Sequence, residues 1–423
     1  MIKVVKKNKV LSREELEALE KNDLISRILQ LEAYNFQLKQ IMEKNANVKD
    51  VQKSHSSKRK FDFSKCHKRH ILLKLYYLGW EYQGFATQEN TTSTIEHHLF
   101  NALIQSCLIQ SRETSNYHRC GRTDKGVSAY SQVISLDIRS SQTPNEQNDL
   151  DNFKKEIKYC KILNRLLPKN IRCLSWSPAA PDVSARFDCK WRCYKYFFPR
   201  GNMNISAMNA ALKYMIGSHD FRNLCKMDVA NGVTSYIRNI LEAEITCATK
   251  EESNDIMGYD MCTLTIKSNA FLWHQIRCIV GILFLVGREQ ETPEIVQDLL
   301  DIEKCPCKPQ YSLAHYTPLN LFYCEYDNTH WYTDITELEK VIKDLQEEWT
   351  NASVKCAMTR CMLNDLGTLF AKEISDVNFQ PDSLLQGSEA KVYKPLMQRD
   401  TCESLENRIE HYTKKRRLEK TSQ

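Results

Sequence analysis

The feature that most constrains the fold is an alternation of strand and helix patterns that restarts halfway along the chain. The stretch "HILLKLYY" (residues 70–77) alternates large apolar side chains on one face, which is typical of a strand. A helix pattern comes next, opened by a capping box of Ser93 and Glu96. A second alternating stretch, "SQVISLDI" (residues 131–138), predicts the next strand.

A similar series begins again after residue 190. The stretch "RCYKYFF" (residues 192–198) predicts a strand, and a turn at residues 199–202 ends it. The strand "MCTLTIK" (residues 261–267) and a helix beginning near Trp273 belong to this second series, which runs to about Tyr326. We therefore expect two similar halves, each made of strands and helices.

Length and composition suit a globular protein with more than one domain. The 423 residues allow two or three domains with substantial cores. No apolar run approaches eighteen residues, and "MIKVVKKNKV" at the N-terminus lacks the apolar segment of a secretory signal. We expect no membrane contact and a location in the cytoplasm, the nucleus or both.

Seventeen cysteines are scattered singly, which suits buried thiols in a reducing compartment. A structural zinc site would need close ligand pairs with matching partners. The nearest candidate pairs are Cys305 with Cys307, Cys189 with Cys193, and His67 with His70. None of them forms a C-x-x-C pair with a matching partner, so no metal site is predicted.

The formal net charge of +6 is modest, but the basic residues are clustered. They gather at residues 53–60, 68–70 and 414–420, while acidic residues gather near 289–303 and 337–348. Any one run is compatible with a solvated tail or linker. Several basic runs together indicate a polyanionic partner, RNA or DNA first.

The N-terminal segment predicts a helix of its own. Ser12 and Glu15 form a capping box, and leucine, isoleucine and methionine then follow a heptad rhythm up to Met42. Asn35 occupies an a position, which fixes register in coiled coils. A short coiled coil and a helix packed on its own protein remain equally open. The polar residues 45–64 predict a linker.

The loop "RCGRTDKGVSAY" (residues 119–130) resembles a phosphate-binding loop and then departs from it. Gly121 and Gly126 have the spacing of G-x-x-x-x-G-K-[ST], but Val127 stands where the phosphate-binding lysine should be. A nucleotide site is therefore not predicted.

The charges of the same loop point to another role. Arg122 and Lys125 place Asp124 between two cations, which holds its carboxylate ionised. A salt-bridged surface turn and a reactive carboxylate are equally compatible with this charge pattern alone.

Nine letters of the loop, "GRTDKGVSA", resemble the catalytic motif of the TruA-type tRNA pseudouridine synthases nearly letter for letter. The resemblance implies that Asp124 is the catalytic nucleophile in the isomerisation of uridine to pseudouridine. In that reaction the glycosidic C–N bond breaks, the uracil rotates, and it is rejoined through carbon. No redox step or external group is involved, so no cofactor is expected.

Three further segments resemble motifs of this family, and together they cover about residues 68–326. In "RCYKY", Tyr194 aligns with the tyrosine that packs on the flipped base and can serve as a base. In "SNAFLWHQIRCIVG" (residues 268–281), Arg277 aligns with the basic residue that pairs with the aspartate. The segment "GSHDFRNLCK" offers Phe221 and Asn223 as RNA contacts, and Arg122 is assigned to the displaced base or a phosphate.

The resemblance also implies a fold and partners. The expected fold is α+β, with two pseudo-symmetric halves, each an antiparallel sheet backed by helices, around a central basic RNA-binding cleft. Helical N- and C-terminal extensions are added, and these are similar to those of the eukaryotic members that modify tRNA positions 38 and 39 in the anticodon stem-loop. A homodimer bound to tRNA is implied as well.

The predicted domains and the rival functions rest on these interpretations. Residues 1–66 form the helical extension and basic linker, 67–198 the half with the Asp124 loop, 199–330 the half with Arg277, and 331–423 a C-terminal extension. Two alternatives stay open, namely a pseudouridine synthase acting on small nuclear or messenger RNA and a non-catalytic RNA-binding or RNA-folding protein.

Overall fold

The chain falls into two compact units, Met1–Asp62 and Phe63–Gln423. The computed structural model describes residues 61–247, 259–370, 381–386 and 392–421, together with Leu24, Ile25 and Ile28. Most of the predicted N-terminal helix, including Asn35, therefore lies outside the described residues. Within the described part, no helix is both long enough and apolar enough to cross a membrane.

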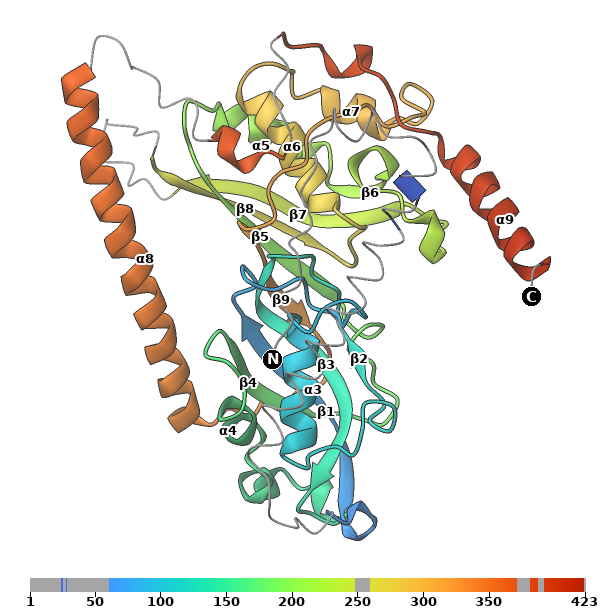
Figure 1. Ribbon diagram of the computed structural model, residues 1–423, viewed down its shortest axis with the longest axis vertical. Coiled ribbons are helices and arrows are strands. Elements are labelled where there is room, and N and C mark those ends of the chain that lie inside the picture. The colour runs from blue at the N-terminus through green and yellow to red at the C-terminus, as the bar shows by residue number, and fades with distance from the viewer. Residues whose placement is uncertain are drawn as a thin grey trace. The chain divides into compact units, whose positions relative to one another are not determined.

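A nine-stranded sheet runs through the second unit in the order β4-β1-β3-β9-β5-β8-β7-β6, with β2 paired to β3 (Figure 1). The strands are β1 (His67–Tyr77), β2 (His118–Arg119), β3 (Ser128–Ser140), β4 (Ile171–Pro178), β5 (Trp191–Pro199), β6 (Gly217–Asp220), β7 (Ile237–Cys247), β8 (Met261–Ser268) and β9 (Leu319–Glu325). Strands were predicted at β1, β3, β5 and β8, and the structure confirms these four.

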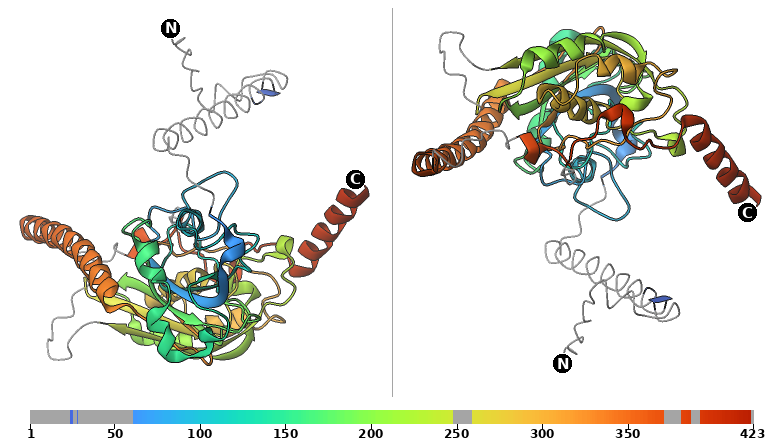
Figure 2. Two further views of the ribbon diagram at one scale, coloured as in Figure 1. Left: turned by 90° about the horizontal axis from the view of Figure 1, so that it is seen from below. Right: turned by 90° about the horizontal axis from the view of Figure 1, so that it is seen from above.

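Helices accompany both parts of the sheet. They are α3 (Ile95–Gln105), α4 (Tyr159–Asn164), α5 (Ile205–Lys213), α6 (Gln275–Gly287), α7 (Ile295–Leu300), α8 (Ile335–Phe370) and α9 (Leu405–Thr421). Short 3-10 helices lie at Phe63–Lys65, Glu146–Asn148, Leu150–Lys155, Arg222–Leu224, Val229–Asn231, Pro381–Leu384 and Leu396–Gln398. The end-on views place α8 and α9 on opposite sides of the sheet (Figure 2).

The fold is α+β, because a mostly antiparallel sheet is backed by helices. Residues 128–129 of β3 pair in parallel with residues 320–321 of β9, whereas the other strand pairs are antiparallel. The strand pairs within each half are antiparallel, as the sequence predicted, and the parallel pair of β3 with β9 joins the two halves, which the sequence did not predict. Strand β9, from the second half of the chain, inserts between β3 and β5, so the two halves share one sheet.

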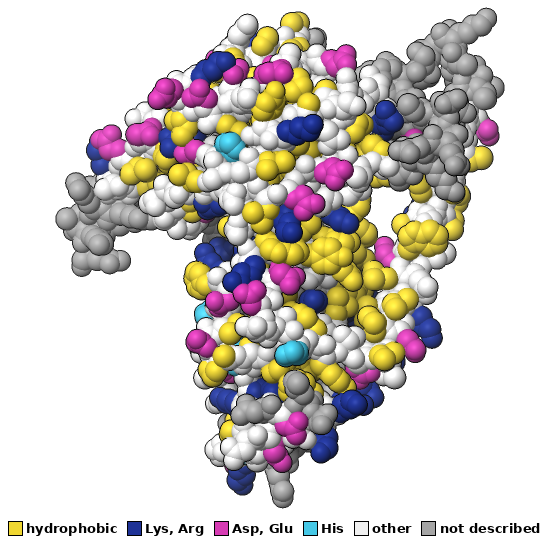
Figure 3. All heavy atoms as spheres, turned by 180° about the vertical axis from the view of Figure 1, so that it is seen from behind, with side chains coloured by type: hydrophobic (Ala, Val, Ile, Leu, Met, Phe, Trp, Pro, Cys, Tyr) yellow, Lys and Arg dark blue, Asp and Glu magenta, His cyan; other side chains and the backbone are white. Residues whose placement is uncertain are grey.

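Side chains on β8 show how the sheet is covered. Cys262, Leu264 and Ile266 are fully buried, while Thr263 and Thr265 between them are half-exposed. This period of two indicates one face packed against helices and one open face. In Figure 1, α3 and α6 lie in front of the sheet. The view from behind shows the other face, where apolar side chains gather over the middle of the sheet (Figure 3).

Two hydrophobic cores lie under these helices. One contains the buried side of β1, β3 and β4 with α3, and it also takes Leu321 from β9. The other contains β7, β8, α5 and α6, and it takes Val127 from the loop before β3. Most described cysteines are free and buried, as expected, but Cys247 and Cys262 form a disulfide between β7 and β8.

The start of α3 differs from the predicted capping box. Thr94, one residue later than Ser93, is the N-cap, and its hydroxyl accepts from the backbone N–H of His97. The Glu96 carboxylate does not reach back to the cap. It is fully buried, and it accepts a hydrogen bond from Tyr117 and forms an ion pair with Arg119. Glu96 therefore binds Tyr117 and Arg119, which are distant in the sequence, in place of the backbone at the start of its own helix.

Candidate active site

The loop that carries Asp124 connects β2 to β3 and is fixed by the chain between β1 and α3. The backbone N–H of Phe85 donates to Thr123 O at 3.1 Å, and that of Gly126 donates to Tyr82 O at 3.0 Å. The Thr123 hydroxyl also lies 2.7 Å from the Tyr77 hydroxyl. Backbone and side-chain bonds on both sides of Asp124 therefore hold its position.

The two glycines of the loop have different importance. Gly126 has a φ of 74°, and a Cβ there would lie 2.2 Å from the ring of Tyr316. A larger residue would be strained and would collide with that ring. At Gly121 a Cβ would meet nothing within 4 Å. Only the second glycine is thus required by the shape of the loop.

Trp273 and His274, at the start of α6, bind the Asp124 carboxylate. Trp273 Nε1 donates to Oδ1 at 3.2 Å, and His274 Nε2 lies 3.3 Å from Oδ2. The Asp124 side chain keeps 33% of its surface exposed, so a substrate can reach it. Sequence reasoning left Trp273 and His274 off the catalytic set, although both belong to the segment whose family resemblance identified Arg277.

Arg277 does not pair directly with Asp124, contrary to the expectation. Its buried guanidinium donates from Nε to Ala314 O at 2.8 Å and from Nη2 to Gln386 Oε1 at 2.7 Å. Nη1 lies 3.2 Å from His274 Nε2, which stands between the guanidinium and the carboxylate. Burial lowers the pKa of Arg277, and attraction to Asp124 opposes that shift. The arginine is close enough to act electrostatically without an ion pair.

His274 occupies a strained position between these two charges. Its φ of 58° is left-handed, a conformation that costs a non-glycine residue about 1–3 kcal/mol. Its Nε2 can donate to Asp124 or accept from Arg277, but a single ring nitrogen cannot do both. Among the described atoms, its buried Nδ1 has no hydrogen-bond partner. The proton position on this ring therefore decides which neighbour it binds.

Tyr194 lies on β5 with its ring edge-on to Phe271, at a centroid distance of 5.2 Å. Burial raises the pKa of the Tyr194 hydroxyl well above its usual value. A neutral phenol is a poor base, so the geometry favours a packing role. Two residues earlier, Arg192 donates to Cys120 O at 3.1 Å and ties β5 to the catalytic loop.

The residues assigned to RNA contacts divide into two groups. Arg122 is exposed and makes no hydrogen bond or ion pair within the described part of the chain. Phe221 and Asn223 are fully buried, and the Asn223 amide donates to Leu299 O at 3.0 Å and to Cys305 O. Their assignment as RNA contacts is therefore wrong, because both belong to the core.

The surroundings of Asp124 are cationic and open. The Lys226 ammonium lies 4.3 Å from the centre of the Trp273 ring, and Arg122 and Lys125 are exposed on the loop itself. A cavity of about 1050 Å³ elsewhere in the molecule is lined by Lys68, Cys189 and other residues, but not by Asp124. The carboxylate therefore faces solvent at a basic surface, where a large anionic substrate can approach.

Comparisons with known proteins agree with this geometry. The family model described as tRNA pseudouridine synthase matches residues 211–327, a range that includes Trp273, His274 and Arg277 but not the Asp124 loop. The mouse protein named tRNA pseudouridine(38/39) synthase is 45% identical over 94% of this chain and 89% of its own length. The human protein of that name is 43% identical over 94% and 88%. The protein of that name from Saccharomyces cerevisiae is 41% identical over 76% and 74%.

Proposed function

Because this chain belongs to the TruA-type family of tRNA pseudouridine synthases, we propose that it isomerises uridine to pseudouridine at positions 38 and 39 of tRNA. The similarity to synthases named for these positions extends over most of the chain. The observation in the structure that supports catalysis is the partly exposed Asp124 carboxylate, fixed by Trp273 and His274.

In the proposed reaction Asp124 acts as the nucleophile. The bond between N1 of uracil and C1′ of ribose breaks, the base rotates, and a bond between C5 and C1′ replaces it. The C5 proton leaves and N1 gains a proton, so no external group is consumed. Trp273 and His274 each bind one oxygen of Asp124, which fixes the carboxylate while leaving further lone pairs for attack.

The cations around Asp124 place positive charge near the proposed nucleophile. Arg277 is held by Ala314 and Gln386, so its charge stays near the carboxylate without direct contact. When Nε2 of His274 carries its proton it donates to Asp124, and Arg277 then acts on the carboxylate through space alone. Because this charge is already in place before the reaction begins, it need not move during the reaction.

The flipped uridine needs new contacts in place of those it loses. Turning a base out of a stem or loop costs a few kcal/mol, which the pocket must offset. Tyr194 can stack on the base, because its side chain is only partly buried. The exposed Arg122 can bind the displaced base or a neighbouring phosphate.

The proposed assembly is a homodimer that uses α8. Every seventh residue along one face of α8 is exposed and apolar or a cysteine, namely Ile335, Ile342, Trp349, Cys356 and Leu363. This repeat is the spacing of a coiled-coil seam. The first turns of α8 are anchored to β4 by the ion pair of Arg172 with Asp344 at 3.0 Å. The exposed face of the later turns is therefore available for a second helix. A second copy of the chain would cover it.

The proposed location is the cytoplasm, the nucleus or both. Most described cysteines are free thiols, which suits a reducing compartment.

Mapping pseudouridine in a defined substrate tests the proposed activity. Purified protein would be incubated with an unmodified tRNA transcript that carries uridine at positions 38 and 39, and with a transcript carrying cytidine at both. We expect modification of the first transcript only. Modification confined to uridines elsewhere in the anticodon arm would contradict the assigned positions but not the chemistry. No modification of any tRNA would contradict the proposed function.

A further inference from the structure

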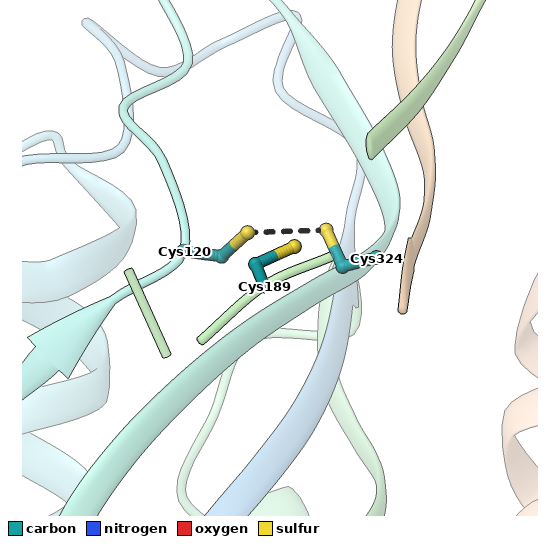
Figure 4. A group of neighbouring side chains, drawn as sticks. All are labelled: Cys120, Cys189 and Cys324. Carbon is teal, nitrogen blue, oxygen red and sulfur yellow. Dashed lines mark hydrogen bonds between the residues drawn. The ribbon is translucent and has the colours of Figure 1, made fainter. Parts of the chain in front are cut away.

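Three buried cysteines from distant parts of the chain meet beside the catalytic loop. Cys120 follows β2, Cys189 precedes β5, and Cys324 lies on β9, and their exposed fractions are 3%, 8% and 6%. Figure 4 shows the three sulfur atoms turned toward one another. All three lie within 4.8 Å of one another, and Cys120 Sγ is 3.4 Å from Cys324 Sγ.

This spacing fits a single metal ion. A zinc–thiolate bond of about 2.3 Å places sulfur atoms about 3.8 Å apart in a tetrahedral site and about 4.0 Å apart in a trigonal one. The Cys120–Cys324 sulfur separation of 3.4 Å lies just below these values, and the upper limit of 4.8 Å for the three pairs lies above them. Side-chain movements of no more than about 1 Å would therefore complete the site.

The charge next to the cluster indicates the type of ion. Arg192 donates to the backbone oxygens of Cys120 at 3.1 Å and Arg186 at 2.8 Å, and no carboxylate of the described chain pairs with it. Metal binding would convert the cysteines to thiolates, and one guanidinium alone cannot balance three of them. Three thiolates, one guanidinium and one divalent ion together have no net charge.

We propose that Cys120, Cys189 and Cys324 bind one thiophilic divalent metal ion, of which zinc fits best. Soft thiolate ligands select zinc over the hard cations magnesium and calcium. Binding displaces the remaining thiol protons to solvent, so affinity should rise with pH. The proposal rests on the cysteine geometry and does not depend on the RNA substrate.

The structure also provides an entry path and a place for a fourth ligand. Cys189 and Tyr326 line a cavity of about 1050 Å³, so this cavity adjoins the cluster at Cys189. The Tyr326 hydroxyl donates to Ala185 O at 2.6 Å. Solvent from this cavity can complete a tetrahedral zinc site, since three protein ligands and a water are a known arrangement.

A metal here would position the active site without touching the substrate. Cys120 lies four residues before Asp124, and Cys189 lies five residues before Tyr194. The ion would link the catalytic loop, β5 and β9, three segments that are far apart in the sequence. We therefore expect metal loss to loosen the loop and lower stability.

Metal analysis of the full-length protein tests the proposal. Protein purified under reducing conditions and reconstituted with zinc should retain about one equivalent after gel filtration. Cobalt substitution should give a near-ultraviolet thiolate-to-cobalt charge-transfer band, which reports on the wild-type chain without any mutation. A chelator strong enough to remove the ion should lower the melting temperature.

Two variants provide the matched comparison. Cys324→Ala should lose the cobalt band and at least tenfold in zinc affinity. Cys173→Ala, at a free cysteine buried in the same core, should keep both. Wild-type protein that binds neither zinc nor cobalt would overturn the proposal. So would a Cys324→Ala variant with unchanged binding, or a Cys120–Cys324 disulfide in the protein isolated from cells, which would indicate a redox pair instead.

Discussion

The carboxylate of Asp124 can be replaced by an uncharged amide of almost the same shape. Asp124→Asn keeps an oxygen that accepts from Trp273 but removes the negative charge. Because the nucleophile is lost while the surrounding cations remain, turnover should fall at least about a thousandfold and tRNA affinity should stay within a few-fold. Single-turnover assays and equilibrium binding measure the two quantities. Appreciable pseudouridine formation by the variant would remove Asp124 from its proposed role.

Arg277 acts on Asp124 through space, so the effect of its charge can be separated from that of its contacts. Arg277→Met removes a cation near the carboxylate and should slow the chemical step at neutral pH by about tenfold or more. Arg277→Lys should keep part of the rate at neutral pH. Gln386→Leu serves as the control, since it removes one contact of Arg277 but not the charge. A near-normal single-turnover rate for the Met variant would make Arg277 structural.

The sequence identified some site residues and missed others for physical reasons. Asp124 and Arg277 were found because their motifs resemble those of a family. His274 was discounted because a histidine at a helix start is usually structural, and its left-handed backbone is invisible in the sequence. Phe221 and Asn223 were misplaced because a mixed polar and aromatic stretch does not reveal which side chains turn into a core.

At the scale of elements, the buried charge at the start of α3 predicts a dependence of stability on pH. Burial raises the pKa of Glu96, but Arg119 and hydrogen bonds lower it further, so the net pKa lies below its ordinary 4.5. The ionised carboxylate therefore stabilises the fold above pH 4.5, and this contribution is lost as the pH falls through the lowered pKa.

Glu96→Gln tests this contribution. The substitution should lower the free energy of unfolding by about 3 kcal/mol at pH 7, because it leaves Arg112 and Arg119 without their buried partner. The difference from wild type should shrink toward acidic pH. Glu113→Gln, at an exposed position nearby, is the control and should change little. Denaturant unfolding at several pH values measures both, and a constant difference would contradict the argument.

The exposed seam of α8 makes a prediction about assembly. Trp349→Glu places a charge at a position where 71% of the side chain is exposed and a second helix would pack. It should shift the protein to the monomer. Asn351→Glu adds the same charge at an exposed position about 200° around the helix from Trp349 and should leave the dimer intact. Sedimentation velocity reports the mass, and an unchanged mass for Trp349→Glu would exclude α8 as the interface.

The alternation of apolar and polar residues predicted individual strands and helices well, but it did not predict how the strands pair. Alternation located β1 and β8 because each has one buried face, a property of the segment itself. The insertion of β9 between β3 and β5 depends on pairing across nearly two hundred residues, which no local pattern records. For the same reason the meeting of Cys120, Cys189 and Cys324 was not visible in a search for closely spaced metal ligands.

At the scale of the whole molecule, the candidate site is assembled from both halves of the chain. The Asp124 loop belongs to the part around β1 and β3, while Trp273 and His274 precede α6 in the other part. Val127 of the loop packs in the core of that second part. The carboxylate therefore acquires its partners only when the two parts have packed together, which explains why neither half alone defines the site.

Two separate properties decide how tRNA is held and which uridine is chosen. Positions 38 and 39 lie where the anticodon stem meets its loop, so a base there should be easier to turn out than one in mid-stem. Phosphate contacts from exposed cations such as Arg122 supply affinity and fix register, but they read no sequence. Raising the salt concentration should therefore weaken binding steeply, since counterion release drives those contacts, while the site of modification stays at 38 and 39.

Affinity and pseudouridine maps measured across a salt series, with intact tRNA and with a tRNA whose stem is lengthened by one base pair, separate the two effects. A site that drifts to other uridines as salt rises would show that phosphate contacts, and not the ease of flipping at the stem–loop junction, choose the target.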